Sequence, residues 1–368
     1  MGIRVLVVDD SAIFRRVVSD ALGGVPGVEV VGTSSNGKLA LARMAALRPD
    51  VVTLDIEMPE MNGIEVLEAM KPAGLKACVI ALSALTVRGG ELTVHALELG
   101  AFDFLTKPEG GSPEANLALL RTQLAPMIRA YERRRDIHNI LRSEAGPKAA
   151  LDRPADALPA SPPGPAPVVR RPSTAPALVL IGVSTGGPSA LATLVPALPR
   201  DLAAPVFIVQ HMPPLFTAPL AKSLAAKSVL PVTEAVDGET AARGHVYLAP
   251  GGRHMKLAQD ESGGVVIRIT EDPPENNCRP AVDYLFRSAA LQFPGRAVAA
   301  VLTGMGRDGT AGLGMLKRTG CFAIAQDEPS CVVFGMPKEA IQAGVVDVVA
   351  PLDAIAGTIV RALREVRS

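Results

Sequence analysis

The sequence has few aromatic residues and no tryptophan: Phe, Tyr and Trp together make up 3% of its 368 residues. That leaves little material for the stacking platforms that bind single-stranded nucleic acids. The charges also balance, with 37 Lys and Arg against 37 Asp and Glu. Strong attraction to nucleic acid or to an anionic membrane is therefore not expected, and no helix-turn-helix or basic patch indicates a transcriptional regulator.

Cysteine is scarce as well. The four cysteines are Cys78, Cys278, Cys321 and Cys331, and no two are spaced as Cys-x-x-Cys. This spacing predicts reduced thiols rather than a zinc site or a disulfide framework. No apolar run approaches the ~20 residues that a membrane span requires, and the N-terminus lacks a secretory signal pattern. We expect a cytoplasmic protein without membrane insertion.

Proline, by contrast, is concentrated in one segment, with nine prolines between residues 146 and 176. Such a segment cannot bury enough apolar surface to offset the entropy lost on ordering. We predict a first domain over residues 1–125, a helix end and Pro-rich linker over 126–176, and a second domain over 177–368.

Both flanking halves alternate short apolar runs with amphipathic stretches. The apolar runs cover residues 3–8, 28–33, 51–54, 78–82 and 102–105 in the first half, and 178–182, 206–210, 245–249 and 297–303 in the second. Continuous Val/Ile/Leu strands separated by helices predict parallel sheets covered on both faces. The fold class is therefore α/β in both halves, with residues 265–269 as a member of a hairpin.

Polar residues follow the strands of the first half. Asp9 and Asp10 follow the first strand, Asp55 follows the third, Ser83 the fourth and Lys107 the fifth. The carboxyl ends of parallel strands gather at one edge of a sheet, so three carboxylates, a hydroxyl and an ammonium converge there. Such carboxylates need a proton or a cation, and oxygen ligands suit Mg²⁺. An isolated aspartate at a strand end could instead be a helix N-cap.

This half resembles the receiver domain of two-component response regulators, on the segments 7–11, 54–63 and 103–108. The resemblance implies a flavodoxin-like, five-stranded parallel sheet and phosphorylation of Asp55 by a histidine kinase. It further implies that Mg²⁺ is bound by Asp10, Asp55 and the Glu57 carbonyl with Asp9 assisting, that Ser83 and Lys107 hold phosphate oxygens, and that Phe104 is the switch aromatic. A cis bond before Pro108 is expected on the same grounds.

In the second half, the apolar run 178–181 leads into the sequence Gly182-Val183-Ser184-Thr185-Gly186, and a helical stretch follows. A strand, a tight glycine turn and a helix would present Ser184 at the rim of the sheet, as in a nucleophile elbow. The motif by itself is also compatible with a phosphate-binding loop or a simple helix cap.

A serine nucleophile needs a base and an acid that orients the base. Of five histidines, His211 directly follows the strand 206–210 and so shares the rim with Ser184. Asp308 is the only acid in the glycine-rich loop 304–309 after another strand. The order Ser, His, Asp differs from that of α/β-hydrolases, although triads recur in several orders on unrelated folds.

Residues 177–365 resemble the catalytic domain of chemotaxis protein-glutamate methylesterases, the CheB-type regulators. The matching segments include 182–188, 210–214, 247–251, 279–283, 302–309, 325–327 and 333–337. Leu215 stands where that family typically has glycine. The resemblance implies a doubly wound, mostly parallel α/β domain that hydrolyses glutamate γ-methyl esters of chemoreceptors and deamidates receptor glutamines. The Thr185 and Met305 N–H groups would be the oxyanion donors, and this reaction would need no cofactor.

The implied partners are chemoreceptor cytoplasmic helices as substrate and the histidine kinase of the chemotaxis system as phosphodonor. Two alternatives stay open at this stage. One is a response regulator of a related chemosensory pathway that acts on a different protein. The other is a regulator that binds a nucleotide through residues 182–187.

Overall fold

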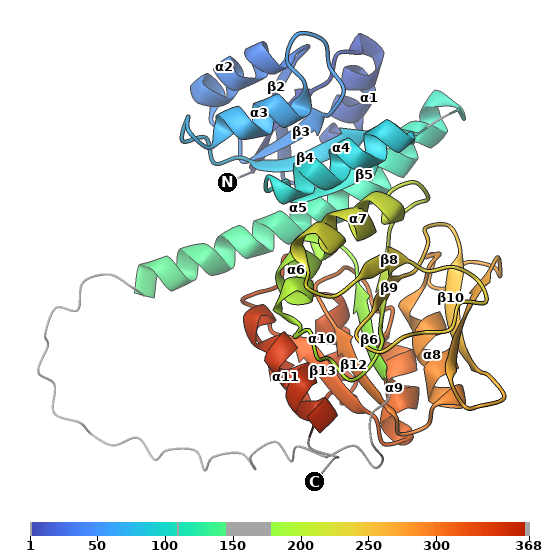
Figure 1. The fold of residues 1–368 in the computed structure, drawn as a ribbon. Helices are drawn as coiled ribbons and strands as arrows, with labels where there is room; N and C mark the ends of the chain where they lie inside the picture. The colour runs from blue at the N-terminus through green and yellow to red at the C-terminus, as the bar shows by residue number, and fades with distance from the viewer. Residues whose placement is uncertain (1, 109, 145–177, 365–368) are drawn as a thin grey trace, which may run out of the picture.

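The computed structural model describes residues 2–108, 110–144 and 178–364, which form two α/β domains (Figure 1). The Pro-rich segment of residues 146–176 lies outside the described residues, so its assignment as a linker stays a prediction. None of the described helices combines the length and apolar character that crossing a membrane requires.

The first domain alternates strands and helices. Its elements are β1 (Ile3–Val8), α1 (Ala12–Gly23), β2 (Val28–Ser34), α2 (Gly37–Leu47), β3 (Val51–Asp55), α3 (Gly63–Met70), β4 (Cys78–Ser83), α4 (Val87–Glu98), β5 (Asp103–Thr106) and α5 (Pro113–Glu144). The five strands pair in parallel in the order β2-β1-β3-β4-β5. The predicted five-stranded parallel sheet is confirmed, and the central strand β3 is buried throughout, as its apolar sequence requires.

Helix α5 continues past residue 125, where the sequence analysis ended the first domain. Leu120, Leu124 and Ile128 are buried at a spacing of four residues, so the apolar stripe that packs on the first domain runs across Pro126. The run of charged residues 132–136, within the segment predicted as a helix end and linker, therefore lies inside a long helix rather than at its end.

The second domain is built on a seven-stranded sheet. Its elements are β6 (Leu178–Val183), α6 (Gly187–Leu194), the short 3₁₀ helix η1 (Val195–Ala197), β7 (Val206–Gln210), α7 (Thr217–Lys227), β8 (Val232–Glu234), β9 (Val246–Leu248), β10 (His254–Gln259), β11 (Val265–Thr270), α8 (Val282–Gln292), β12 (Ala297–Val301), α9 (Thr310–Arg318), β13 (Phe322–Gln326), α10 (Met336–Gln342), β14 (Val348–Ala350) and α11 (Leu352–Arg364). The sheet order is β14-β13-β12-β6-β7-β9-β8, and every neighbouring pair is parallel.

The predicted doubly wound, mostly parallel sheet is thus confirmed. Strands β10 and β11 form a separate antiparallel pair, which is the hairpin expected at residues 265–269. The expected cis bond before Pro108 was wrong, since among the described residues the one cis bond is Arg279–Pro280. An X–Pro bond is trans by default. With the trans bond before Pro108, Lys107 still donates its backbone N–H to the Ser83 carbonyl at 2.8 Å.

The two domains pack against each other through α4 of the first and α6 and α7 of the second (Figure 1). Glu98 forms an ion pair with Lys227, 2.7 Å apart, and accepts a hydrogen bond from Ser223. At Gly90 the two backbones come so close that an added Cβ would lie 2.3 Å from the carbonyl oxygen of Leu215. Leu215, the residue that departs from the family pattern, has φ +71° and lies at this contact.

Candidate active site and phosphorylation site

Three adjacent strands position the residues singled out in the second domain. β6 lies between β12 and β7 in the sheet. Ser184 follows β6, His211 follows β7, and Asp308 lies in the loop after β12. From β6 the chain continues to β7 on one side, whereas β12 lies on the other side of β6. The strand order reverses at this point, and α/β sheets place their sites in the crevice that the reversal creates.

The turn that carries Ser184 is fixed by its own backbone. The Ser184 N–H donates to the Thr303 carbonyl at 3.0 Å, and the Gly187 N–H returns to the Ser184 carbonyl at 2.7 Å. Gly186 has φ +74°, and a Cβ there would lie 2.4 Å from Val332. Glycine is therefore required at position 186 both for its conformation and for space.

His211 and Asp308 form a close pair, with 2.7 Å between His211 Nε2 and Asp308 Oδ2. Burial alone would lower the pKa of His211, but its hydrogen bond to Asp308 and the neighbouring Cys278 raise it to about 9. Burial likewise would raise the pKa of Asp308, yet the hydrogen bond and charge of His211 hold it at about 2. The pair is thus a carboxylate that stabilises a cationic imidazole.

Backbone and side-chain donors hold the Asp308 carboxylate in place. It accepts hydrogen bonds from the N–H groups of Val282 at 2.6 Å and Asp283 at 3.0 Å, and from Asn276 Nδ2 at 2.8 Å. The same Asn276 amide bridges to the buried carboxylate of Asp283 at 3.0 Å.

Cys278 contacts the other nitrogen of His211, with 3.5 Å between its Sγ and Nδ1. In this arrangement the described side chains form no hydrogen bond between Ser184 and His211. Catalytic hydrogen bonds are often long in the free enzyme and shorten when substrate binds. Nδ1 is therefore the imidazole nitrogen left for chemistry once Nε2 is committed to Asp308.

Sequence reasoning missed Asn276, Cys278 and Asp283 as site residues. Asp283 did fall in a matching segment, but nothing in its local pattern set it apart from a surface acid at a helix start. Asn276 and Cys278 lie in an irregular loop, where no periodicity assigns a partner.

The N–H groups of Thr185 and Met305, predicted as oxyanion donors, both lie on turns at this rim. Neither donates to an acceptor within the part of the chain that the structure describes. Thr185 is buried and Met305 half-buried. The Thr185 carbonyl accepts from Thr303 Oγ1 at 2.9 Å, which fixes the orientation of that peptide.

Ser184 and His211 line a small pocket of about 170 Å³ at the boundary between the two domains. The first domain contributes Asp103 and Phe104 to its wall. Ligand sites for drug-sized molecules commonly occupy roughly 300–1,000 Å³, so this pocket is smaller than such a site.

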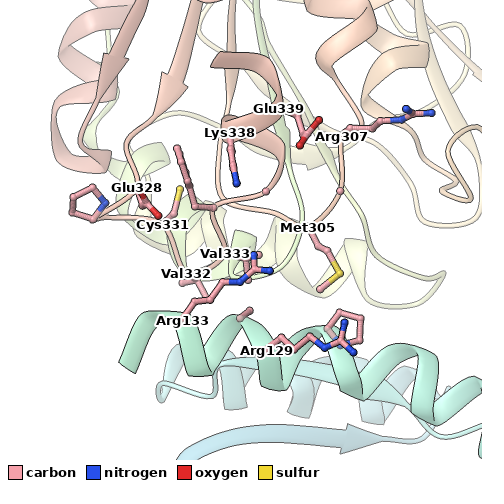
Figure 2. A pocket seen from close by; sticks show the side chains of 16 residues that line it. Arg129, Arg133, Met305, Arg307, Glu328, Cys331, Val332, Val333, Lys338 and Glu339 are labelled. Atoms are coloured by element: carbon pink, nitrogen blue, oxygen red, sulfur yellow. The ribbon is translucent and has the colours of Figure 1, made fainter. Parts of the chain in front are cut away.

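A larger cavity of about 760 Å³ lies beside the site, between α5 and the loops of the second domain (Figure 2). Met305 lines it, so it adjoins the predicted oxyanion position. Arg129 and Arg133 reach into it from α5, and Arg307 and Lys338 come from the opposite wall. Glu328 and Glu339 also line it, which leaves cationic side chains in excess.

The first domain brings its predicted acidic residues together. Ligand oxygens of Asp9, Asp10 and Asp55 lie within 4.8 Å of one another. Lys107 Nζ lies 2.7 Å from Asp9 Oδ2 and 2.7 Å from Asp55 Oδ2. Burial raises the pKa of Asp55 to about 6 despite this lysine, and it raises that of Asp9 as well. A group of oxygen ligands short of positive charge fits a hard divalent cation such as Mg²⁺.

The remaining residues predicted for this site lie around it. The Glu57 N–H donates to Asp55 Oδ1 at 3.3 Å, and the Glu57 side chain lies 3.8 Å from Arg88. The Ser83 hydroxyl donates to the Gly89 carbonyl at 3.2 Å. Phe104 is buried on the second domain rather than facing the carboxylates.

Comparison with known proteins matches both halves of the chain. The profile of the CheB methylesterase family matches residues 179–359, and that of the response regulator receiver domain matches residues 5–115. The protein-glutamate methylesterase/protein-glutamine glutaminase of Desulfotalea psychrophila is 46% identical over 369 residues, covering 99% of each chain. The protein of the same name from Bacillus subtilis is 42% identical, again over 99% of both.

Among solved structures, the CheB methylesterase catalytic domain of Thermotoga maritima is 44% identical with a TM-score of 0.50. It covers 50% of this chain and 98% of its own length. The sequence identity stays at this level along the whole chain, and the two family profiles match in the same order as the two folded domains. Together these findings assign the chain to one family. This chain belongs to the CheB methylesterase family and carries a response regulator receiver domain ahead of its catalytic domain.

Proposed function

We propose that this chain is a chemotaxis response regulator that hydrolyses γ-methyl esters of receptor glutamates and deamidates receptor glutamines. The observation that carries the proposal is the His211–Asp308 pair at the rim beside Ser184, with 2.7 Å between Nε2 and Oδ2. Such a pair supplies the base that a serine needs in order to attack a carbonyl, once the imidazole is neutral.

The same chemistry serves both substrates. Neutral His211 takes the Ser184 hydroxyl proton at Nδ1 while its Nε2–H stays hydrogen-bonded to Asp308. Ser184 Oγ bonds to the γ-carbonyl carbon, and the tetrahedral adduct collapses as the C–O or C–N bond breaks. His211 returns the proton to the leaving methanol or ammonia. Water activated by His211 then hydrolyses the acyl-serine to glutamate.

The free N–H groups of Thr185 and Met305 would receive the negative charge that develops on the carbonyl oxygen. Removing one such donor costs about 2.7–4 kcal/mol in other serine hydrolases. Arg307 and Lys338 of the second domain line the cavity beside Met305 and support an acidic protein substrate, because a helix that carries several glutamates would find their positive charges nearby.

The receiver domain would regulate this site through phosphorylation of Asp55 by a histidine kinase. Asp10, Asp55 and the Glu57 carbonyl, with Asp9 assisting, would hold Mg²⁺, which offsets the negative charge of the carboxylates and the incoming phosphoryl group. Lys107, already between Asp9 and Asp55, and Ser83 would contact phosphate oxygens. The hydrolytic step itself would need no cofactor.

The position of Asp103 and Phe104 supports an inhibitory role for the unphosphorylated receiver. Both residues line the pocket that holds Ser184 and His211, so the docked receiver lies beside the nucleophile, where a receptor helix would have to approach. Phosphorylation at Asp55 would shift Ser83 and Phe104 and weaken docking of the receiver. A protein that is phosphorylated by a cytoplasmic kinase and acts on cytoplasmic receptor helices would itself act in the cytoplasm.

The nucleotide-binding alternative has less support. A Cβ at Gly187 would lie 1.8 Å from Gln210 Oε1, and one at Gly186 would lie 2.4 Å from Val332. The start of α6, where a phosphate would have to lie, is therefore filled by these side chains.

Methanol release from methylated receptor membranes tests the proposal, measured with and without a phosphodonor. Ser184→Ala should lower kcat by several orders of magnitude and leave the fold intact, since members of a triad act as a unit. His211→Ala should be comparably damaging. His245→Ala is the matched control, because His245 lies away from the rim and contacts Thr233. Wild-type rates in the Ser184 variant would refute the assignment.

A further inference from the structure

Cys278 and His211 stand at the distance that two ligands of one tetrahedral metal ion require. Zn–S and Zn–N bonds of about 2.3 and 2.05 Å at a tetrahedral angle place the two ligand atoms about 3.6 Å apart. Cys278 Sγ and His211 Nδ1 are 3.5 Å apart and are joined by a hydrogen bond, so a metal ion would take the place of the shared proton. From this match we propose that the active site contains an inhibitory site for a soft divalent cation, Zn²⁺, bound by the Cys278 thiolate and His211 Nδ1.

The tautomer of His211 supports this assignment. Its Nε2 faces Asp308 Oδ2 at 2.7 Å, so a neutral ring carries its proton on Nε2 and leaves the Nδ1 lone pair toward Cys278. A carboxylate behind a histidine is the usual outer partner at zinc sites, where it orients the ring and raises its basicity. Asp308 is itself held by Val282, Asp283 and Asn276, so the ring cannot easily turn away.

The ligand set also selects among cations. A thiolate and an imidazole favour zinc over magnesium or calcium, which prefer oxygen ligands. Cys278, His211 and Asp308 form one of two groups of potential ligands in the described part of the chain. The other group, the receiver carboxylates, offers oxygen alone. Two protein ligands leave two positions for water or Ser184, so the site would bind reversibly rather than structurally.

Bound zinc would stop hydrolysis, because Nδ1 is the atom that accepts the serine proton. Metal and proton compete for that nitrogen, so zinc affinity should rise with pH and binding should release protons. The inference extends beyond the proposed function, and the binding test below does not depend on esterase activity.

The test uses the full-length protein with Co²⁺ as a spectroscopic probe and excess Mg²⁺ to saturate the receiver carboxylates. One equivalent of Co²⁺ should produce a thiolate-to-cobalt charge-transfer band, and one equivalent of Zn²⁺ should abolish it. Cys278→Ser should remove the band and lower Zn²⁺ affinity at least roughly tenfold. Cys321→Ser is the matched control, because Cys321 is buried elsewhere in the same domain.

A second variant keeps the test decisive if Cys278→Ser does not fold. His211→Gln retains the thiol but should lose the band and the tight binding. Zn²⁺ should also inhibit ester hydrolysis by the wild type, with an inhibition constant at least roughly tenfold higher for Cys278→Ser, each measured against its own uninhibited rate. A wild type without the charge-transfer band, or a band that survives in either variant, would overturn the proposal.

Discussion

The ring of Phe104 in the receiver stacks on the ring of Phe216 in the catalytic domain, with centroids 4.9 Å apart and planes inclined by 22°. Phe104 follows the buried Asp103, which lines the Ser184 pocket, and Phe216 precedes α7. The residue expected to respond to phosphorylation is therefore itself part of the contact that covers the active site. Through this stacking contact, a change at the domain interface would directly affect the active site.

Gly90→Ala should activate the unphosphorylated enzyme. The new Cβ would lie 2.3 Å from the Leu215 carbonyl oxygen across the interface, and overpacking of this kind costs roughly 1–3 kcal/mol. Within α4 itself alanine is the better helix former, so the receiver should not unfold. The basal rate of methanol release should rise roughly fivefold or more.

Gly23→Ala provides the control for that experiment, since a Cβ at Gly23 meets nothing within 4 Å. It should leave the basal rate unchanged. An unchanged rate in Gly90→Ala, with the protein folded and phosphorylatable, would argue against inhibition by docking.

The pH dependence of kcat/KM should report the unusual state of His211. The base works only when Nδ1 is free of a proton, and the pKa of His211 is raised from 6.5 to about 9 by Asp308 and Cys278. Activity should therefore increase with pH beyond 7, reach half its maximum near pH 9 and level off above that pH. Cys278→Ser should move this ascending limb to lower pH. A wild-type limb centred near 6.5 would contradict the expectation.

Phosphorylation should occur on Asp55 and should depend on Mg²⁺. Acetyl phosphate with Mg²⁺ should add one phosphoryl group, detected by intact mass, and none to Asp55→Asn or in the presence of EDTA. Equal labelling of Asp55→Asn would refute the site.

Asp103 should make receiver docking sensitive to pH. It is buried against the catalytic domain, and burial raises its pKa to about 7 although Phe104 and Thr185 donate hydrogen bonds to it. The docked state thus retains the proton between the ordinary pKa of 3.8 and about 7, so docking should weaken as the pH rises through that window and then level off.

Asp103→Asn isolates this effect, because the amide is neutral at every pH. Relative to the wild type, its basal rate should be lower at both pH 5 and pH 7, and the deficit should be larger at pH 7, whereas the titration of His211 is common to both proteins. A wild-type to variant ratio that does not change with pH would exclude Asp103 as the cause.

The sequence determined the features that depend on local order along the chain. Apolar runs predicted the strands. The residues that follow each run were then expected at the carboxyl edge of the sheet, and Ser184, His211, Asp55 and Lys107 could be selected in this way. Glycine at position 186 could likewise be assigned to a tight turn, because a left-handed backbone conformation is a local requirement, whereas its close packing against Val332 is not.

Only the tertiary structure decided which side chains face one another across the chain. It placed Cys278 on one nitrogen of His211 and Asp308 on the other, and it stacked Phe104 on Phe216. These contacts join residues that no periodicity connects, since they depend on the order of strands within a sheet and on how two separately folded domains pack. The composition of the sequence and the spacing of its residues do not show how the strands and domains pack. The burial of side chains and the distances between them in the structure do.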